Sequence, residues 1–110
     1  MNRISPEMRG CIEECLRCYQ LCLAEASQHC LEAGGKHVEP EHFRLMLACA
    51  EICRTSAHLM LLGVEQHKAS CAACAAVCEA CAESCAQVGD MQECVEVCRR
   101  CAESCRRMAG

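Results

Sequence analysis

The hydrophobic pattern of the chain is unusual because cysteine occupies the positions where a water-soluble helix normally buries leucine or isoleucine. In residues 71–85, CAACAAVCEACAESC, five cysteines recur at spacings of 3, 4, 3 and 4. These are the spacings of the a and d positions of a heptad. Cysteines alternate in the same way in residues 11–22 and 94–105, and a further apolar stretch carries Cys49 and Cys53. Each stretch is therefore predicted to be an amphipathic helix whose buried face is made of thiols.

Residues that start and end helices divide the chain into four segments. Ser5 followed by Pro6 is typical of a helix N-terminus, and Asp90 with Glu93 three residues later resembles a capping box. Glycines end the first three segments, at residues 34–35, 63 and 89. We therefore predict helices over about residues 5–33, 40–62, 65–88 and 90–108. Because short connections make successive helices antiparallel, the expected fold is all-α, an up-down-up-down four-helix bundle with a cysteine-lined core, in a single domain over residues 1–110.

A bundle of this type turns the a and d positions of all its helices toward one axis. All but one of the 16 cysteines lie on these positions, and Cys30 falls just off the register. The prediction is a line of thiols along the bundle axis. The candidate metal ligands are Cys11, Cys15, Cys18, Cys22, Cys30, Cys49, Cys53, Cys71, Cys74, Cys78, Cys81, Cys85, Cys94, Cys98, Cys101 and Cys105.

Methionine and histidine extend the cysteine faces by heptad steps. Every methionine except Met1 lies on such a position, as do three of the five histidines. In the predicted topology the candidate auxiliary ligands gather at the two bundle ends, with His29, His42, Met46 and Met91 at one end and Met8, Met60, His67 and Met108 at the other. The alternative is that the methionines are ordinary core residues and the histidines are solvated. We expect metal to enter at the first end, because its two histidines flank the Gly34-Gly35 connection.

Composition and charge exclude several classes of function. A net charge of −4 with only two lysines argues against nucleic-acid binding. No uninterrupted apolar run approaches about 18 residues, so no membrane-spanning segment is expected. The N-terminal sequence MNRISPEMRG lacks the apolar core of a secretory signal, which favours a reducing cytoplasm rather than a disulfide framework. No Ser/His/Asp set, phosphate-binding loop or open-site metal motif indicates an enzyme.

The chain contains four CxxC pairs, but their context is helical. Thioredoxin-like pairs belong to a βαβ unit, zinc ribbons place their pairs on turns, and ferredoxin clusters need a wrapped run of cysteines. Charge balance instead favours Cu(I), because one monovalent ion per thiolate leaves a sealed core neutral, whereas Zn²⁺ with four thiolates does not. Two alternatives remain open: a zinc or cadmium buffer of metallothionein type, and a metal-free thiol redox buffer or sensor.

The cysteine-bearing motifs resemble those of the copper storage protein family. The resemblance rests on CIEECLRCYQLC (11–22), PEHFRLMLACAEIC (40–53), the stretch at 71–85 and CVEVCRRCAESC (94–105). It implies a helical bundle that stores several Cu(I) ions per chain, and a cytosolic location for members without a signal peptide. The second helix departs from the pattern, because Ser56 and Met60 follow Cys49 and Cys53 on its cysteine face.

The second helix also predicts self-association. Leu47, Leu61 and Leu62 lie off its cysteine face, so the helix is apolar nearly all round and needs a second surface to bury it. We expect a homo-oligomer, either a dimer or a tetramer. The other expected partners are copper ions and the copper chaperones that deliver them.

Overall fold

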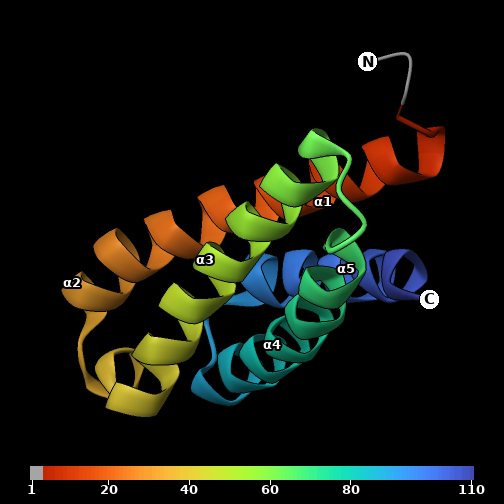
Figure 1. Cartoon of the computed structure of the whole chain (residues 1–110). Coiled ribbons are helices and arrows are strands. Elements are labelled where there is room, and N and C mark those ends of the chain that lie inside the picture. The colour runs from red at the N-terminus through yellow and green to blue at the C-terminus, as the bar shows by residue number, and fades with distance from the viewer. Residues whose placement is uncertain (1–3) are drawn as a thin grey trace.

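The chain folds into a four-helix bundle in the computed structural model, which describes residues 4–110 (Figure 1). The elements are α1 (Pro6–Ala24), a π-helical segment η1 (Glu25–Cys30), α2 (Leu31–Ala33), a 3-10 segment η2 (Gly35–Val38), α3 (Pro40–Leu62), α4 (His67–Val88) and α5 (Gln92–Ala109). No strand occurs within residues 4–110. The all-α prediction is confirmed, since α1, η1 and α2 together form the first long helix.

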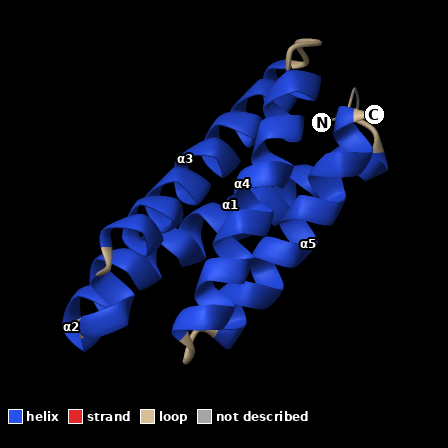
Figure 2. Ribbon diagram, turned by 90° about the horizontal axis from the view of Figure 1, so that it is seen from below, coloured by secondary structure: helices blue, strands red, loops and turns tan. Residues whose placement is uncertain are grey.

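The four long helices form a square in cross-section. The packed neighbours are α1 with α3, α3 with α4, α4 with α5, and α5 with α1. The bundle is elongated, about 45 Å along its longest axis. Figures 1 and 2 show α2 at one end, together with the start of α3 and the connection from α4 to α5. We call this the α2 end; the opposite end, which holds the C-terminus and the connection from α3 to α4, is the C-terminal end.

Two of the four predicted helix starts, those of α1 and α3, agree with the structure. The Oγ atom of Ser5 accepts a hydrogen bond from the backbone N–H of Met8 at 3.1 Å, so Ser5 caps α1 as expected. Helix α3 starts at Pro40, as predicted, whereas α4 starts two residues later than predicted, at His67. The capping box at Asp90 is wrong. Asp90 adopts a positive φ of 58° directly after a glycine, so its backbone completes the turn between α4 and α5 and its side chain does not cap α5.

The π-helical segment corrects the predicted register of the first helix. A π-turn inserts one extra residue and so rotates everything after it by about one residue, or 100°. The step along the buried face from Cys22 to Cys30 is therefore eight residues, through the fully buried Ala26, rather than the seven that a regular heptad requires. As a result Cys30 is fully buried, whereas His29, which was predicted to lie on the cysteine face, is only partly buried.

Cysteine is the main component of the core. All 16 cysteines are buried and unpaired, and the largest fully buried side chains are those of Met46 and Met60. The thiols therefore replace leucine as the filling of the bundle.

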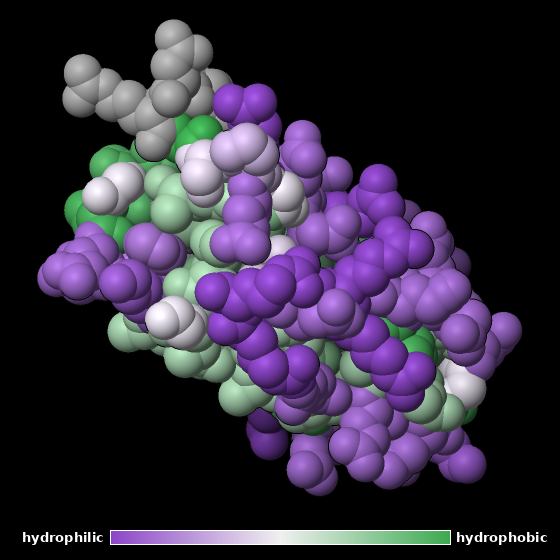
Figure 3. Space-filling model, turned by 90° about the vertical axis from the view of Figure 1, so that its right-hand side faces the viewer, coloured by the Kyte–Doolittle hydropathy of each residue, from purple (hydrophilic) through white to green (hydrophobic). Residues whose placement is uncertain are grey.

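Two of the helices, α3 and α4, are long and apolar enough to cross a membrane by length and composition alone. They pass this test although neither contains a long uninterrupted apolar run, because cysteine and alanine raise the mean hydropathy of both helices. Both turn a row of cysteines and alanines into the bundle core, and the core helix of a soluble protein passes the same test. The face seen from the C-terminal end is mostly hydrophilic, with hydrophobic side chains gathered at its upper left and again at its lower right (Figure 3).

Candidate metal site

Twelve of the cysteines form a continuous central thiol column. They fall into five groups in which all sulfur atoms lie within 4.8 Å of one another, and every member of every group is buried. The groups are Cys11/Cys71/Cys105, Cys15/Cys74/Cys101/Cys105, Cys53/Cys74/Cys78/Cys101, Cys18/Cys49/Cys53/Cys78 and Cys18/Cys22/Cys49/Cys98. Because successive groups share members, the thiols form one connected array rather than separate sites.

The contacts within the column join sulfurs from all four long helices. The Sγ atoms of Cys15 and Cys105 lie 3.5 Å apart across the interface of α1 and α5, and Cys18 Sγ lies 3.7 Å from Cys49 Sγ across the interface of α1 and α3. Cys53 Sγ is 3.5 Å from Cys78 Sγ between α3 and α4. A metal ion in this column would therefore be bound by thiols of different helices and would tie those helices together.

The other four cysteines, Cys30, Cys81, Cys85 and Cys94, stand outside these groups. Two of them contact a methionine: the thiol of Cys85 donates to Met46 Sδ at 3.4 Å, and that of Cys81 donates to the same atom at 3.6 Å. Met46 is fully buried. It was predicted as an auxiliary ligand at the α2 end, and the structure brings it together with two thiols there.

Histidines gather around η2 at the α2 end. The rings of His29 and His37 meet edge to face with their centres 5.0 Å apart, and His37 Nδ1 lies 3.9 Å from Cys30 Sγ. His42 is 4% exposed, and its Nδ1 forms a 2.7 Å hydrogen bond with Ser84 Oγ. The Nε2 atoms of His29 and His42 are buried and have no hydrogen-bond partner.

His37 is a functional candidate that sequence reasoning missed. It lies in a connection, where a heptad cannot be continued, so the heptad pattern does not mark it as a ligand. Its signal in the sequence is that it follows Cys30 by seven residues and stands in a short connection between two cysteine-bearing helices. Met91, predicted at the same end, is also buried, with 4% exposure.

The candidates at the C-terminal end are less uniform. The thiol of Cys71 donates to Met60 Sδ at 3.9 Å, and Met8 and Met108 are partly buried against the core. His67 instead uses Nδ1 to donate a 2.7 Å hydrogen bond to the backbone carbonyl of Val64. The structure thus gives His67 a role at the start of α4 and records no thiol contact for it.

Contacts between neighbouring thiols control their protonation. Contacts with Cys18 and Cys22, together with burial, raise the pKa of Cys49 well above its ordinary value. Burial raises the pKa of Cys30, and burial followed by the nearby His37 lowers the pKa of His42. Cys30 and Cys49 are consequently protonated and His42 neutral in the metal-free protein at neutral pH. A metal ion that binds these thiols must displace their protons.

An all-α bundle with a buried array of unpaired thiols defines a protein that binds soft metal ions in its core. The sequence profile of the copper storage protein family matches residues 4–110. The chain belongs to the copper storage protein family. A comparison with curated proteins found no match.

Solved structures agree with this assignment. The protein Nmul_A1745 from Nitrosospira multiformis is 54% identical, with a TM-score of 0.92 and 94% of each chain covered. The Cu(I)-bound copper storage protein BsCsp3, from Bacillus subtilis, is 36% identical with a TM-score of 0.86, covering 94% of this chain and 99% of that one. A cytosolic copper storage protein from Streptomyces lividans, described with five coppers, is 34% identical with a TM-score of 0.78, covering 94% of this chain and 92% of that one.

Proposed function

We propose that this protein stores Cu(I), holding several ions per chain in the central thiol column, as a binding protein rather than a catalyst. The observation that carries this proposal is the sharing of thiols between successive groups in the column. Cu(I) is a soft monovalent ion that accepts two or three sulfur ligands, so bridging thiolates can hold a chain of such ions. One positive charge per thiolate also removes the cost of burying unpaired charge.

The same sharing of thiols argues against a zinc or cadmium buffer. A tetrahedral Zn²⁺ site uses four ligands of its own. At most two of the four four-thiol groups can be filled at once, because any third group shares a cysteine with one of the first two. Each filled group would also bury a net charge of about −2 in a core without cations. Divalent ions would therefore fill only part of this column and leave it negatively charged.

Anaerobic titration of the reduced protein tests the proposal. With Cu(I) we expect binding to approach roughly one ion per thiolate, against 16 thiols in the chain. With Zn²⁺ we expect saturation at roughly one ion per three or four thiolates. Equal numbers of the two ions, or the absence of tight Cu(I) binding, would contradict storage. A reversible disulfide couple at cellular potentials in the copper-free protein would instead support the redox alternative.

We further propose that copper enters at the α2 end. Exchangeable imidazole and thioether ligands there can pass Cu(I) inward to thiolates, which bind it more tightly. Supporting this, Met46 contacts two thiols, and the imidazoles of His29 and His42 each keep one nitrogen without a partner.

A pair of matched variants tests the entrance. Replacing His29, His42, Met46 and Met91 together should slow Cu(I) loading while the final number of bound ions stays nearly the same. The control replaces Met8, Met60, Met108 and His67 at the C-terminal end. Slowing in the control alone would place the entrance at that end, and equal rates in both variants would argue against an entrance of this kind.

The expected self-association and location complete the proposal. Leu47, Leu61 and Leu62 of α3 are 40%, 47% and 62% exposed, so the chain leaves apolar surface that a second copy could cover as a dimer or tetramer. Sedimentation at micromolar concentration should show an oligomer that dissociates when Leu61 and Leu62 become Gln. A wild-type monomer would refute this part. We place the protein in the cytoplasm, with copper chaperones as delivery partners.

A further inference from the structure

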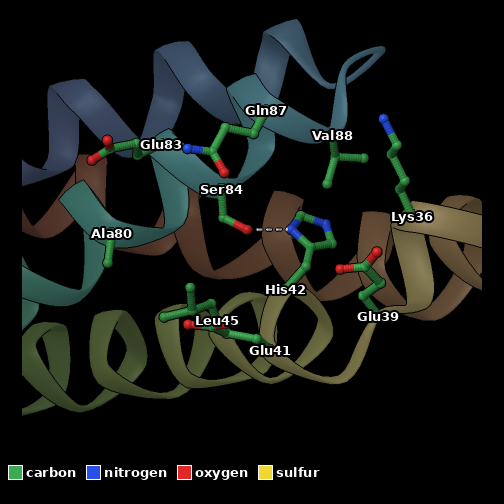
Figure 4. A pocket seen from close by; sticks show the side chains of 10 residues that line it. All are labelled: Lys36, Glu39, Glu41, His42, Leu45, Ala80, Glu83, Ser84, Gln87 and Val88. Carbon is green, nitrogen blue, oxygen red and sulfur yellow. Dashed lines mark hydrogen bonds between the residues drawn. The ribbon is translucent and has the colours of Figure 1, made fainter.

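A surface pocket between α3 and α4 lies directly over His42. Its volume is about 480 Å³, which falls in the range of small-molecule sites. Figure 4 shows the imidazole of His42 between Ser84 and Glu39, with one ring nitrogen bonded to Ser84 and the other on the side of Lys36 and Val88. That second nitrogen is Nε2, which is buried and has no hydrogen-bond partner. The pocket therefore has an unused metal-binding atom at its base.

The lining of the pocket carries both signs of charge. Lys36 supplies an ammonium group, and Glu39, Glu41 and Glu83 supply carboxylates. All four side chains are exposed, so those of Lys36 and Glu39 can move aside when a molecule docks over His42. Such a lining complements a small zwitterion, whose carboxylate would pair with Lys36 and whose ammonium would pair with a glutamate.

A route leads from His42 into the core. Met46 lies one helical turn after His42 on α3, so the two side chains share one face. Met46 Sδ in turn contacts the thiols of Cys85 and Cys81 at 3.4 and 3.6 Å. The ligands along this route become progressively better for Cu(I), from one imidazole nitrogen through a thioether to two thiols.

We propose that this pocket docks a small zwitterionic thiol that carries Cu(I), and that His42 Nε2 is the first protein atom to bind the copper. The inference rests on the proposed storage of Cu(I) and specifies how the copper arrives. In the exchange, the bond between Cu(I) and the carrier sulfur breaks as the bond to Nε2 forms, and copper stays in the +1 state. The departing carrier thiolate takes up the proton that Cys85 releases when the ion reaches it.

Transfer kinetics from the Cu(I)–glutathione complex to the metal-free protein, followed anaerobically, test the proposal. Glutathione serves as the probe because it is a thiol with an ammonium group and two carboxylates. The transfer rate should saturate with donor concentration, as docking requires. Lys36→Gln should raise the half-saturating concentration about two- to fivefold, the size expected for one exposed ion pair. Lys68→Gln, which removes an exposed lysine at the start of α4, is the matched control and should change nothing.

A second donor separates docking from metal exchange. With Cu(I) bound to 2-mercaptoethanol, which has no charged groups, Lys36→Gln should have no effect. His42→Gln keeps a side chain that can bond Ser84 but removes the imidazole, and it should slow transfer from both donors. S-methylglutathione, which cannot exchange copper through a free thiol, should shift the amide signals of Lys36 and Ser84 in nuclear magnetic resonance spectra of the metal-free protein.

The outcomes distinguish this inference from the storage function. A rate that rises linearly with donor concentration, or equal half-saturation for wild type and Lys36→Gln, would overturn docking. Unchanged transfer in His42→Gln, with the variant folded by circular dichroism, would overturn the role of Nε2. In each of these cases the final copper number would still match that of the wild type. A low copper number in the wild type itself would refute storage.

Discussion

Ser56 interrupts the cysteine face of α3, and converting it to cysteine should enlarge the copper store. Ser56 follows Cys53 by three residues and precedes Met60 by four, so it stands where the pattern calls for a further ligand. Its side chain is fully buried, and its Oγ atom has no hydrogen-bond partner. Ser56→Cys replaces that oxygen with sulfur of similar reach, so the new thiol joins the column without a change of backbone.

The size of the effect follows from two separate terms. One added thiolate should raise the number of bound Cu(I) ions by about one. A buried hydroxyl without a partner costs about 1–3 kcal/mol. Since 1 kcal/mol shifts the Tm of a domain of this length by about 4 °C, relieving that cost should raise the Tm of the metal-free protein by about 4–12 °C. Ser56→Ala removes the hydroxyl without adding a ligand, so it should share the gain in stability and leave the copper number unchanged.

Anaerobic Cu(I) titration and calorimetry of the metal-free variants measure the two terms. Ser27→Cys is the control for the added thiol, because Ser27 is exposed and lies away from the core. If Ser56→Cys bound no more copper than wild type or Ser27→Cys, then position 56 would not face the thiol column. If neither substitution at position 56 raised the Tm, the buried Ser56 hydroxyl would not destabilise the metal-free protein as argued.

Three further outcomes follow from the same structure. Saturating Cu(I) should raise the Tm, because each ion binds the folded column and adds to its stability; an unchanged Tm would contradict storage. Thiols such as Cys49 have a higher pKa in the folded chain than in the unfolded chain, where it is 9.0. Their contribution to the stability of the metal-free fold is complete below pH 9 and is lost as the pH rises further, so the Tm of the metal-free protein should fall above pH 9 and that of the copper-loaded protein should not. Parallel Tm profiles for the two forms would refute the argument. Deleting Ser27 should convert the π-turn to a regular α-turn and leave Cys30 on the heptad position seven residues after Cys22, so Cys30 should stay protected from alkylation, as detected by mass spectrometry. Alkylation of Cys30 in this variant would show that the π-turn does more than absorb one extra residue.

The bundle and its thiol column could be predicted because both depend on local periodicity. Alternation of three and four residues places cysteines on one face of a helix wherever the helix is regular, and burial of that face requires partner helices. Cys18 and Cys49, which lie on two different predicted helices, meet at the bundle axis in this way. The predicted register was wrong at Cys30 and His29, where the helix is not regular, since Cys30 is fully buried and His29 only partly buried. A π-turn is chosen by tertiary packing of the whole helix, and the spacing of eight between Cys22 and Cys30 was its only trace in the sequence.

The α2 end shows the same limit for chemistry. Cys30 and His37 come together because η1 rotates one residue inward while η2 folds the connection back over it. Neither the π-helical segment nor the 3-10 segment leaves a heptad pattern in the sequence. Heptad spacing therefore predicts the thiol column but not the mixed histidine, methionine and cysteine cluster beside it. The distinction has a functional consequence. The proposed functions divide in the same way: we assign tightly held copper to the regular part of the bundle, which the sequence repeats specify, and copper exchange to the irregular end, where imidazole, thioether and thiol ligands lie together.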